Sequence, residues 1–115
     1  MKTTLQYREI NKADRQKAIK QSFTLVNETL VETQFVAPES LLVTMGLDVP
    51  PKQTSKNAAL TWLKHDDPEY DWDFLANNLI PPVVVKDGNL LDGIHRCRLA
   101  AALGESILAA CYFSK

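Results

Sequence analysis

The chain has 115 residues, of which 45% are hydrophobic, and this is enough apolar material for one globular domain with a single core. Its 13 lysines and arginines are balanced by 14 aspartates and glutamates, which gives a formal net charge of -1. This balance excludes the strongly basic composition of a protein that coats nucleic acid without sequence preference.

The cysteines and the N-terminal residues indicate the compartment. Cys97 and Cys111 lack the paired spacing of a zinc or redox motif, so we expect buried free thiols in a reducing environment. The first residues contain no apolar signal segment, and no apolar run reaches the roughly 18 residues that a membrane span needs. We therefore expect a cytoplasmic protein that does not contact a membrane.

The first half of the chain predicts two helices on either side of a strand. Apolar residues spaced three or four apart predict an amphipathic helix over residues 11–31, although the sequence FTLV within it also suits a strand. Residues 33–37 predict a strand, Pro38 the first position of a short helix, and Gly46 its end. The prolines and small polar residues at positions 48–57 predict a loop.

Two further helices are predicted after this loop. The segment that starts at Ser55 has two helical patterns that separate near Pro68. The second of these helices is expected to begin with a cap at Asp71 and to end at Pro81 and Pro82. The residues expected to face the core are Ala59, Leu60 and Leu63 in the first helix and Trp72, Leu75 and Leu79 in the second.

The last third of the chain predicts a hairpin, a helix and a strand. The sequence VVVKDGNLLDG predicts two short strands joined at Asp87 and Gly88, a dipeptide that suits the positive φ angles of a tight turn. IHRCRLAAALG predicts a helix that ends at Gly104, and residues 106–115 predict a final apolar strand.

Four polar or small residues, Asp92, Gly93, His95 and Arg96, gather where the hairpin meets the last helix. His95 and Arg96 fall in the first turn, where N–H groups lack partners within the helix and the helix dipole favours an anion. Cationic side chains are unfavourable at this end of a helix. Two of them in succession, beside a glycine that lets a ligand approach the backbone, therefore predict a bound anion, above all a phosphate. Arg96 would grip the phosphate oxygens, and His95 would donate a hydrogen bond or move a proton.

The residues around this motif have alternative interpretations. Asp92 either supports the site, by orienting His95, holding Arg96, binding magnesium or acting as a base, or it has a structural role as a helix cap and partner of Arg96. Arg98 lies about 200° round the helix from Arg96, so we expect it on the solvated surface. Cys97 is expected to face the core.

The order of elements over residues 81–113 resembles the ParB/sulfiredoxin-like fold. PPVVV, a short hairpin, LLDGIHR, an alanine-rich helix, LG and a last strand follow one another as in that superfamily, and FVAPESL at residues 35–41 is similar to its opening strand and helix. Members hold nucleotide phosphates with a G-x-x-R or D-G-x-H-R element at the start of a helix. The resemblance implies one α+β domain over residues 1–115, a small mixed sheet with helices packed on it.

The motif residues distinguish the branches of this superfamily. Sulfiredoxins have a catalytic cysteine directly before the His-Arg pair, where this chain has Ile94, so sulfiredoxin chemistry is not expected. Partition proteins, which bind CTP and DNA, show Gly-Glu-Arg-Arg, and this chain lacks the glutamate and one arginine. The free-serine kinases, with Asp-Gly-His-His-Arg, match best, and their upstream acid falls by position at Glu39. Their matching residues here are Asp92, Gly93, His95 and Arg96.

Three other segments suggest chemistry, and for each we favour a structural interpretation. Residues 65–73 hold five carboxylates and a histidine, which invites a metal site but is more typical of a solvated turn, so no metal site is expected. Residues 52–56 are expected to form an ordinary exposed loop, since they lack the glycines of a P-loop. The aromatic residues are expected in the core or at its rim rather than as a base-stacking platform: Trp62, Tyr70, Trp72 and Phe74.

The leading hypothesis is a domain that binds a nucleotide or another phosphate-bearing small molecule, with ATP, ADP or CTP and magnesium as expected cofactors. Gly93, His95 and Arg96 would hold the phosphate. If the domain is an enzyme, Asp92 and His95 would be its catalytic residues, in phosphoryl transfer or phosphodiester hydrolysis. One alternative is a module that binds a protein partner through a non-catalytic fold. Another is a DNA-binding regulator or nuclease-like accessory protein that uses Lys52, Lys56, Arg96 and Arg98.

Overall fold

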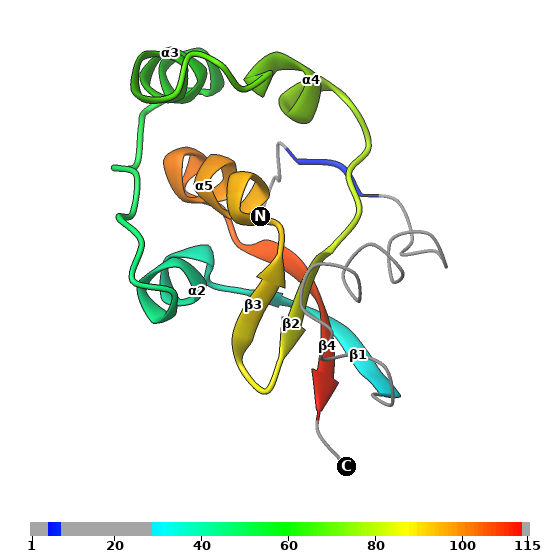
Figure 1. The fold of residues 1–115 in the computed structure, drawn as a ribbon. Coiled ribbons are helices and arrows are strands. Elements are labelled where there is room, and N and C mark those ends of the chain that lie inside the picture. The colour runs from blue at the N-terminus through cyan, green and yellow to red at the C-terminus, as the bar shows by residue number, and fades with distance from the viewer. Residues whose placement is uncertain (1–4, 8–28, 114–115) are drawn as a thin grey trace.

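The structure is a computed structural model that describes residues 5–7 and 29–113. Within these residues, four helices and a four-stranded sheet form an α+β arrangement, as the sequence predicts (Figure 1). The elements in chain order are β1 (Thr29–Val36), α2 (Pro38–Thr44), α3 (Lys56–Asp66), α4 (Trp72–Asn77), β2 (Val83–Lys86), β3 (Asn89–Asp92), α5 (Ile94–Leu103) and β4 (Ile107–Phe113). None of the described helices is long and apolar enough to cross a membrane.

The sheet is mixed and has the strand order β1-β4-β2-β3. β4 is antiparallel to β1 and parallel to β2, and β2 is antiparallel to β3. Because successive residues of a strand point to opposite faces, Val83 and Val85 enter the main core while Val84 packs with Ala110 and Tyr112 in a smaller cluster.

The hairpin between β2 and β3 turns at the predicted dipeptide. Asp87 has φ 49° and Gly88 has φ 83°, the two positive angles of a tight hairpin turn. Farther from the turn the register shifts, so that Val84 pairs with Asp92. The end of β3 and the start of β2 therefore lie side by side, next to the first turn of α5.

α5 is the central helix of the domain. It contacts α2, α3, α4 and β4, and Figure 1 shows it between the sheet and the α3–α4 pair. Alanine side chains let these elements approach closely, which suits a helix that is covered on several sides. Its buried apolar residues are Cys97, Leu99, Ala100, Ala101 and Ala102.

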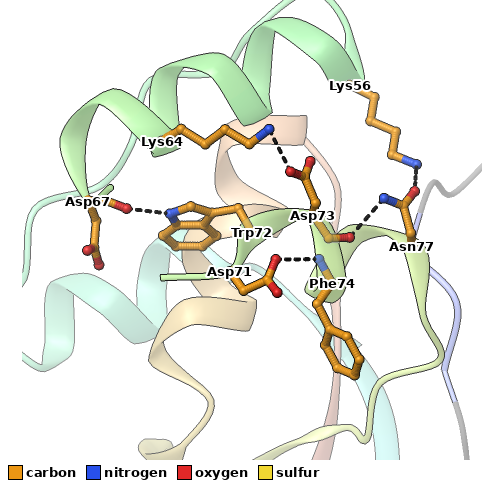
Figure 2. A network of polar contacts seen from close by, with 8 residues as sticks. All are labelled: Lys56, Lys64, Asp67, Asp71, Trp72, Asp73, Phe74 and Asn77. Carbon is orange, nitrogen blue, oxygen red and sulfur yellow. Dashed lines mark hydrogen bonds and ion pairs between the residues drawn. The ribbon is translucent and has the colours of Figure 1, made fainter. Parts of the chain in front are cut away.

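Polar contacts fix the turn between α3 and α4 (Figure 2). Trp72 donates from Nε1 to the backbone oxygen of Asp67 at 3.0 Å, and Asp71 caps α4 by accepting from the N–H of Phe74 at 3.0 Å. Lys64 forms a 2.7 Å ion pair with Asp73 across the same turn. These contacts fix the shape of the turn, and its residues Asp67 and Tyr70 contact His95 in the first turn of α5.

Three sequence predictions in this region are wrong: the end of α4, the burial of Leu79, and the place of Phe74 in the core or at its rim. α4 ends at Asn77, well before the prolines, because Asn78 adopts an extended backbone with φ -126° and ψ 161°. The helical period therefore does not reach Leu79, which is 56% exposed, and Phe74 is also exposed at 63%. Ile80 is buried instead, and its N–H donates to the backbone oxygen of Gln6.

The remaining predictions agree with the described elements, with one exception near the N-terminus. The predicted helix over residues 11–31 lies mostly outside the described residues, but its last three positions belong to β1. β-branched residues such as Thr29 and Val31 favour this extended structure. Pro38 occupies the first turn of α2 as predicted, and Gly46, with φ 73°, follows the end of that helix.

Candidate functional site

Gly93 makes the sharp change from β3 to α5. Its φ of 118° and ψ of 30° lie where a side chain is strained, and an added Cβ would lie only 2.5 Å from Cγ1 of Val83. As the N-cap residue without a side chain, Gly93 cannot accept hydrogen bonds from the N–H groups of the first turn. These N–H groups have no acceptor within the helix, so the start of α5 suits an anion.

Arg96 is a buried anchor in that first turn, with 8% of the residue exposed. Nη1 donates to the backbone oxygens of Pro81 at 2.8 Å and Pro82 at 2.9 Å, and Nη2 donates to Oδ2 of Asp92 at 3.1 Å. These bonds use three of the five N–H donors of the guanidinium. Arg96 therefore joins the segment before β2 to α5, and Asp92 holds Arg96 rather than orienting His95.

His95 contacts the α3–α4 turn instead of Asp92. Its ring stacks on Tyr70, with 3.7 Å between centroids and 1° between planes, and Nε2 lies 3.7 Å from Oδ2 of Asp67. Burial lowers the pKa of His95 from its ordinary value, and the charge of Arg98 lowers it further, while Asp67 opposes both. The neutral imidazole is therefore favoured, and it can donate one hydrogen bond and accept another.

The lowered pKa of His95 predicts a pH dependence of stability. The unfolded chain takes up the proton at its ordinary pKa of 6.5, above the folded value, so the unfolded state binds more protons between the two values. The free energy of unfolding is therefore expected to fall as the pH drops through 6.5, until the folded pKa is passed. A histidine NMR titration, assigned with His95→Gln, should give a midpoint below 6.5, and Asp67→Asn should lower it further. A midpoint above 6.5 would contradict this assignment.

Two pockets meet at the first turn of α5. The first, here called the turn pocket, has a volume of about 450 Å³ and is lined by Tyr70, Leu91 and residues 92–96. The second, here called the side pocket, has a volume of about 460 Å³ and is lined by residues 47–50 and by side chains of α3 and α5. Ile94 and His95 line both pockets, so the two open beside each other.

Arg98 differs from the sequence prediction. Its side chain is only 17% exposed, forms an ion pair with Asp66 and lies over the ring of Trp72, with 5.6 Å from Cζ to the centroid. The end of α3 comes close to α5 and supplies Asp66, which periodicity within α5 cannot reveal. Arg98 consequently lines the side pocket, while Arg96 lines the turn pocket.

Other predicted residues lie away from the turn pocket. Cys97 is fully buried, and burial raises the pKa of its thiol to about 12, so it stays protonated. Glu39 lies in the first turn of α2 and is not among the residues that line either pocket. In the part of the chain that the structure describes, no three His, Cys, Asp or Glu side chains gather closely enough to hold a metal ion.

The four basic side chains that the DNA-binding hypothesis names each contact a different part of the domain. Lys56 donates to Oδ1 of Asn77 at 2.8 Å, and the side chain of Lys52 packs against Gly104. Arg96 and Arg98 each hold a carboxylate. This arrangement gives the hypothesis no particular support.

Sequence reasoning missed Asp67 and Tyr70 as residues of the site. Both belong to the acidic run that we interpreted as a solvated turn, and their contacts with His95 join segments that are distant in sequence.

Comparison of the chain with models of protein families, with curated proteins and with solved structures finds no match. The functional argument therefore rests on the geometry of these pockets.

Proposed function

We propose that this domain binds the phosphate group of a nucleotide, or of another small phosphorylated molecule, in the turn pocket. The observation that carries the proposal is the start of α5, where a glycine N-cap leaves the first-turn N–H groups without a side-chain acceptor beside a pocket of about 450 Å³. A phosphate would accept from these groups and would be stabilised by the helix dipole.

The side chains of the turn pocket support the same ligand. Arg96 places a guanidinium at the positive end of a helix, which is unfavourable unless anions lie nearby, and Asp92 supplies one negative charge. The Arg96 donors that are not bound to Pro81, Pro82 or Asp92 are suited to phosphate oxygens. His95 adds a neutral imidazole at the pocket wall.

The wider proposal is that the fold is of the ParB/sulfiredoxin-like type. It is supported by the hairpin, the Gly93 turn, the alanine-rich α5 and the parallel pairing of β2 with β4.

Asp92 is the single carboxylate among the residues that line the turn pocket, so it would bind magnesium that enters with a nucleotide. Should the pocket turn over its ligand, His95 and Asp92 are the groups for phosphoryl transfer or phosphodiester hydrolysis. A cytoplasmic location belongs to the same proposal, since free buried thiols suit a reducing compartment.

Replacing Ile94 tests the proposal without disturbing the buried anchor. Ile94 is the first residue of α5, is 37% exposed and lines the turn pocket. Ile94→Asp should weaken the binding of ATP, ADP or CTP about tenfold or more, because its carboxylate repels the phosphate. The same change should not lower the melting temperature, because an acidic residue is favourable in the first turn. Calorimetric titration with and without magnesium measures the affinities.

Ile94→Asn is the matched control, since asparagine has nearly the shape of aspartate without the charge. It should bind the nucleotides more tightly than Ile94→Asp. If none of the three nucleotides binds to the wild-type protein, the nucleotide proposal is wrong. If Asp and Asn at this position weaken binding equally, the phosphate lies elsewhere.

A further inference from the structure

The side pocket has a chemical character different from that of the turn pocket. Leu47, Val49 and Ile94 give it apolar walls, and Trp62 contributes an aromatic ring that is half-buried. Its volume of about 460 Å³ is within the range of pockets that hold small organic ligands. A phosphate alone would leave these apolar walls in water, so the pocket suits a larger and flatter group.

Two carboxylates, Asp48 and Asp66, also line the side pocket. Asp66 is engaged by Arg98, whereas Asp48 carries no ion pair in the part of the chain that the structure describes. An ionised carboxylate only accepts hydrogen bonds, so Asp48 favours a ligand that presents an N–H donor. A planar aromatic group with an exocyclic amino group combines both requirements, and adenine and cytosine are such groups.

We propose that the side pocket binds the base of a nucleotide whose phosphates occupy the turn pocket, and that Asp48 selects bases with an exocyclic amino group. Ile94 and His95 form the shared wall over which the sugar would pass. This inference rests on the proposed function and adds to it the place where the base binds and the residue that selects it. Trp62 would stack on the base, and Asp48 would accept a hydrogen bond from the amino group.

Four nucleotides and one inorganic anion test the inference with the wild-type protein. ITP differs from ATP in carrying an oxygen in place of the amino group, and UTP differs from CTP in the same way. ATP should bind about tenfold more tightly than ITP, and CTP about tenfold more tightly than UTP, because a carbonyl cannot donate to a carboxylate. Inorganic tripolyphosphate should bind more weakly than ATP and should leave the tryptophan fluorescence unchanged, whereas ATP should quench it.

Asp48→Asn removes the selecting charge at an exposed position, and an amide can serve either type of base. It should bring the ATP and ITP affinities to within about twofold of each other. Glu69→Gln makes the same change of charge at an exposed residue outside the side pocket, and should keep the difference.

Each outcome separates the two proposals. If ATP, ITP and tripolyphosphate bind equally well, the base site is wrong and the phosphate site stands. If the difference between ATP and ITP persists in Asp48→Asn, another group makes the selection and the role of Asp48 is wrong. If no nucleotide and no tripolyphosphate binds, the proposed function itself fails.

Discussion

Gly93→Ala should lower the free energy of unfolding by about 2–5 kcal/mol. Part of the loss comes from backbone strain, since φ at this position is 118°. The larger part comes from overlap, because the new Cβ would lie 2.5 Å from Cγ1 and 2.9 Å from Cβ of Val83. Val83 is fully buried in β2 and pairs with Ala109, so it has no room to retreat. Urea unfolding monitored by circular dichroism measures the change.

Gly88→Ala provides the control for this prediction. Gly88 also has a positive φ, of 83°, but an added Cβ there would meet nothing within 4 Å. Its expected cost is therefore only the strain of about 1–2 kcal/mol. Equal losses at the two glycines would show that the close approach of Val83 is not what requires a glycine at position 93.

Arg96→Ala is expected to lower the free energy of unfolding by about 3–5 kcal/mol. The substitution leaves the carboxylate of Asp92 and the backbone oxygens of Pro81 and Pro82 without their common donor. The side chains of Arg96 and Asp92 are only 10% and 15% exposed, so water replaces the lost bonds poorly. Arg96→Lys should recover only part of the loss, because an ammonium cannot reach all three acceptors as a planar fork does.

Arg98→Ala is the matched control within the same helix. Arg98 pairs with Asp66, whose side chain is 48% exposed, so the expected loss is about 1 kcal/mol or less. Thermal and urea unfolding of both variants make the comparison. A smaller loss for Arg96→Ala than for Arg98→Ala would contradict the anchoring role. Arg96→Ala is also a poor probe of ligand binding, since it changes the fold and the turn pocket together.

Local patterns in the sequence predicted most of the elements from Thr33 onward. The Asp-Gly dipeptide fixed the hairpin, Pro38 marked the start of α2, and the glycines at 93 and 104 bounded α5. The errors arose where the sequence offers more than one place for an element to end. The asparagines at 77 and 78 can end a helix, as the prolines at 81 and 82 can, and local pattern alone does not decide between the two places.

The residues of the candidate site at the start of α5 were predictable, but their roles were not, and neither were the contacts of His95 with Asp67 and Tyr70. The sequence places His95 and Arg96 in one turn, yet only the packing of the α3–α4 turn shows that His95 stacks on Tyr70. Likewise, the backbone oxygens of Pro81 and Pro82 leave no trace in a pattern of side chains, so the sequence predicts for Arg96 only an acidic partner, either Asp92 or a residue elsewhere. Contacts between distant segments decide these roles.

The position of β4 between β1 and β2 has a consequence for how the domain forms during synthesis. Residues 107–113 pair with both strands. β1 and β2 therefore lack their shared neighbour until these residues have been synthesised. A ribosome must therefore release this segment from its exit tunnel before the sheet can close, and the contact order of the β1–β4 pairing is high. Until then the nascent chain exposes the edge and apolar side chains of β2, the condition in which chaperones bind unfinished proteins.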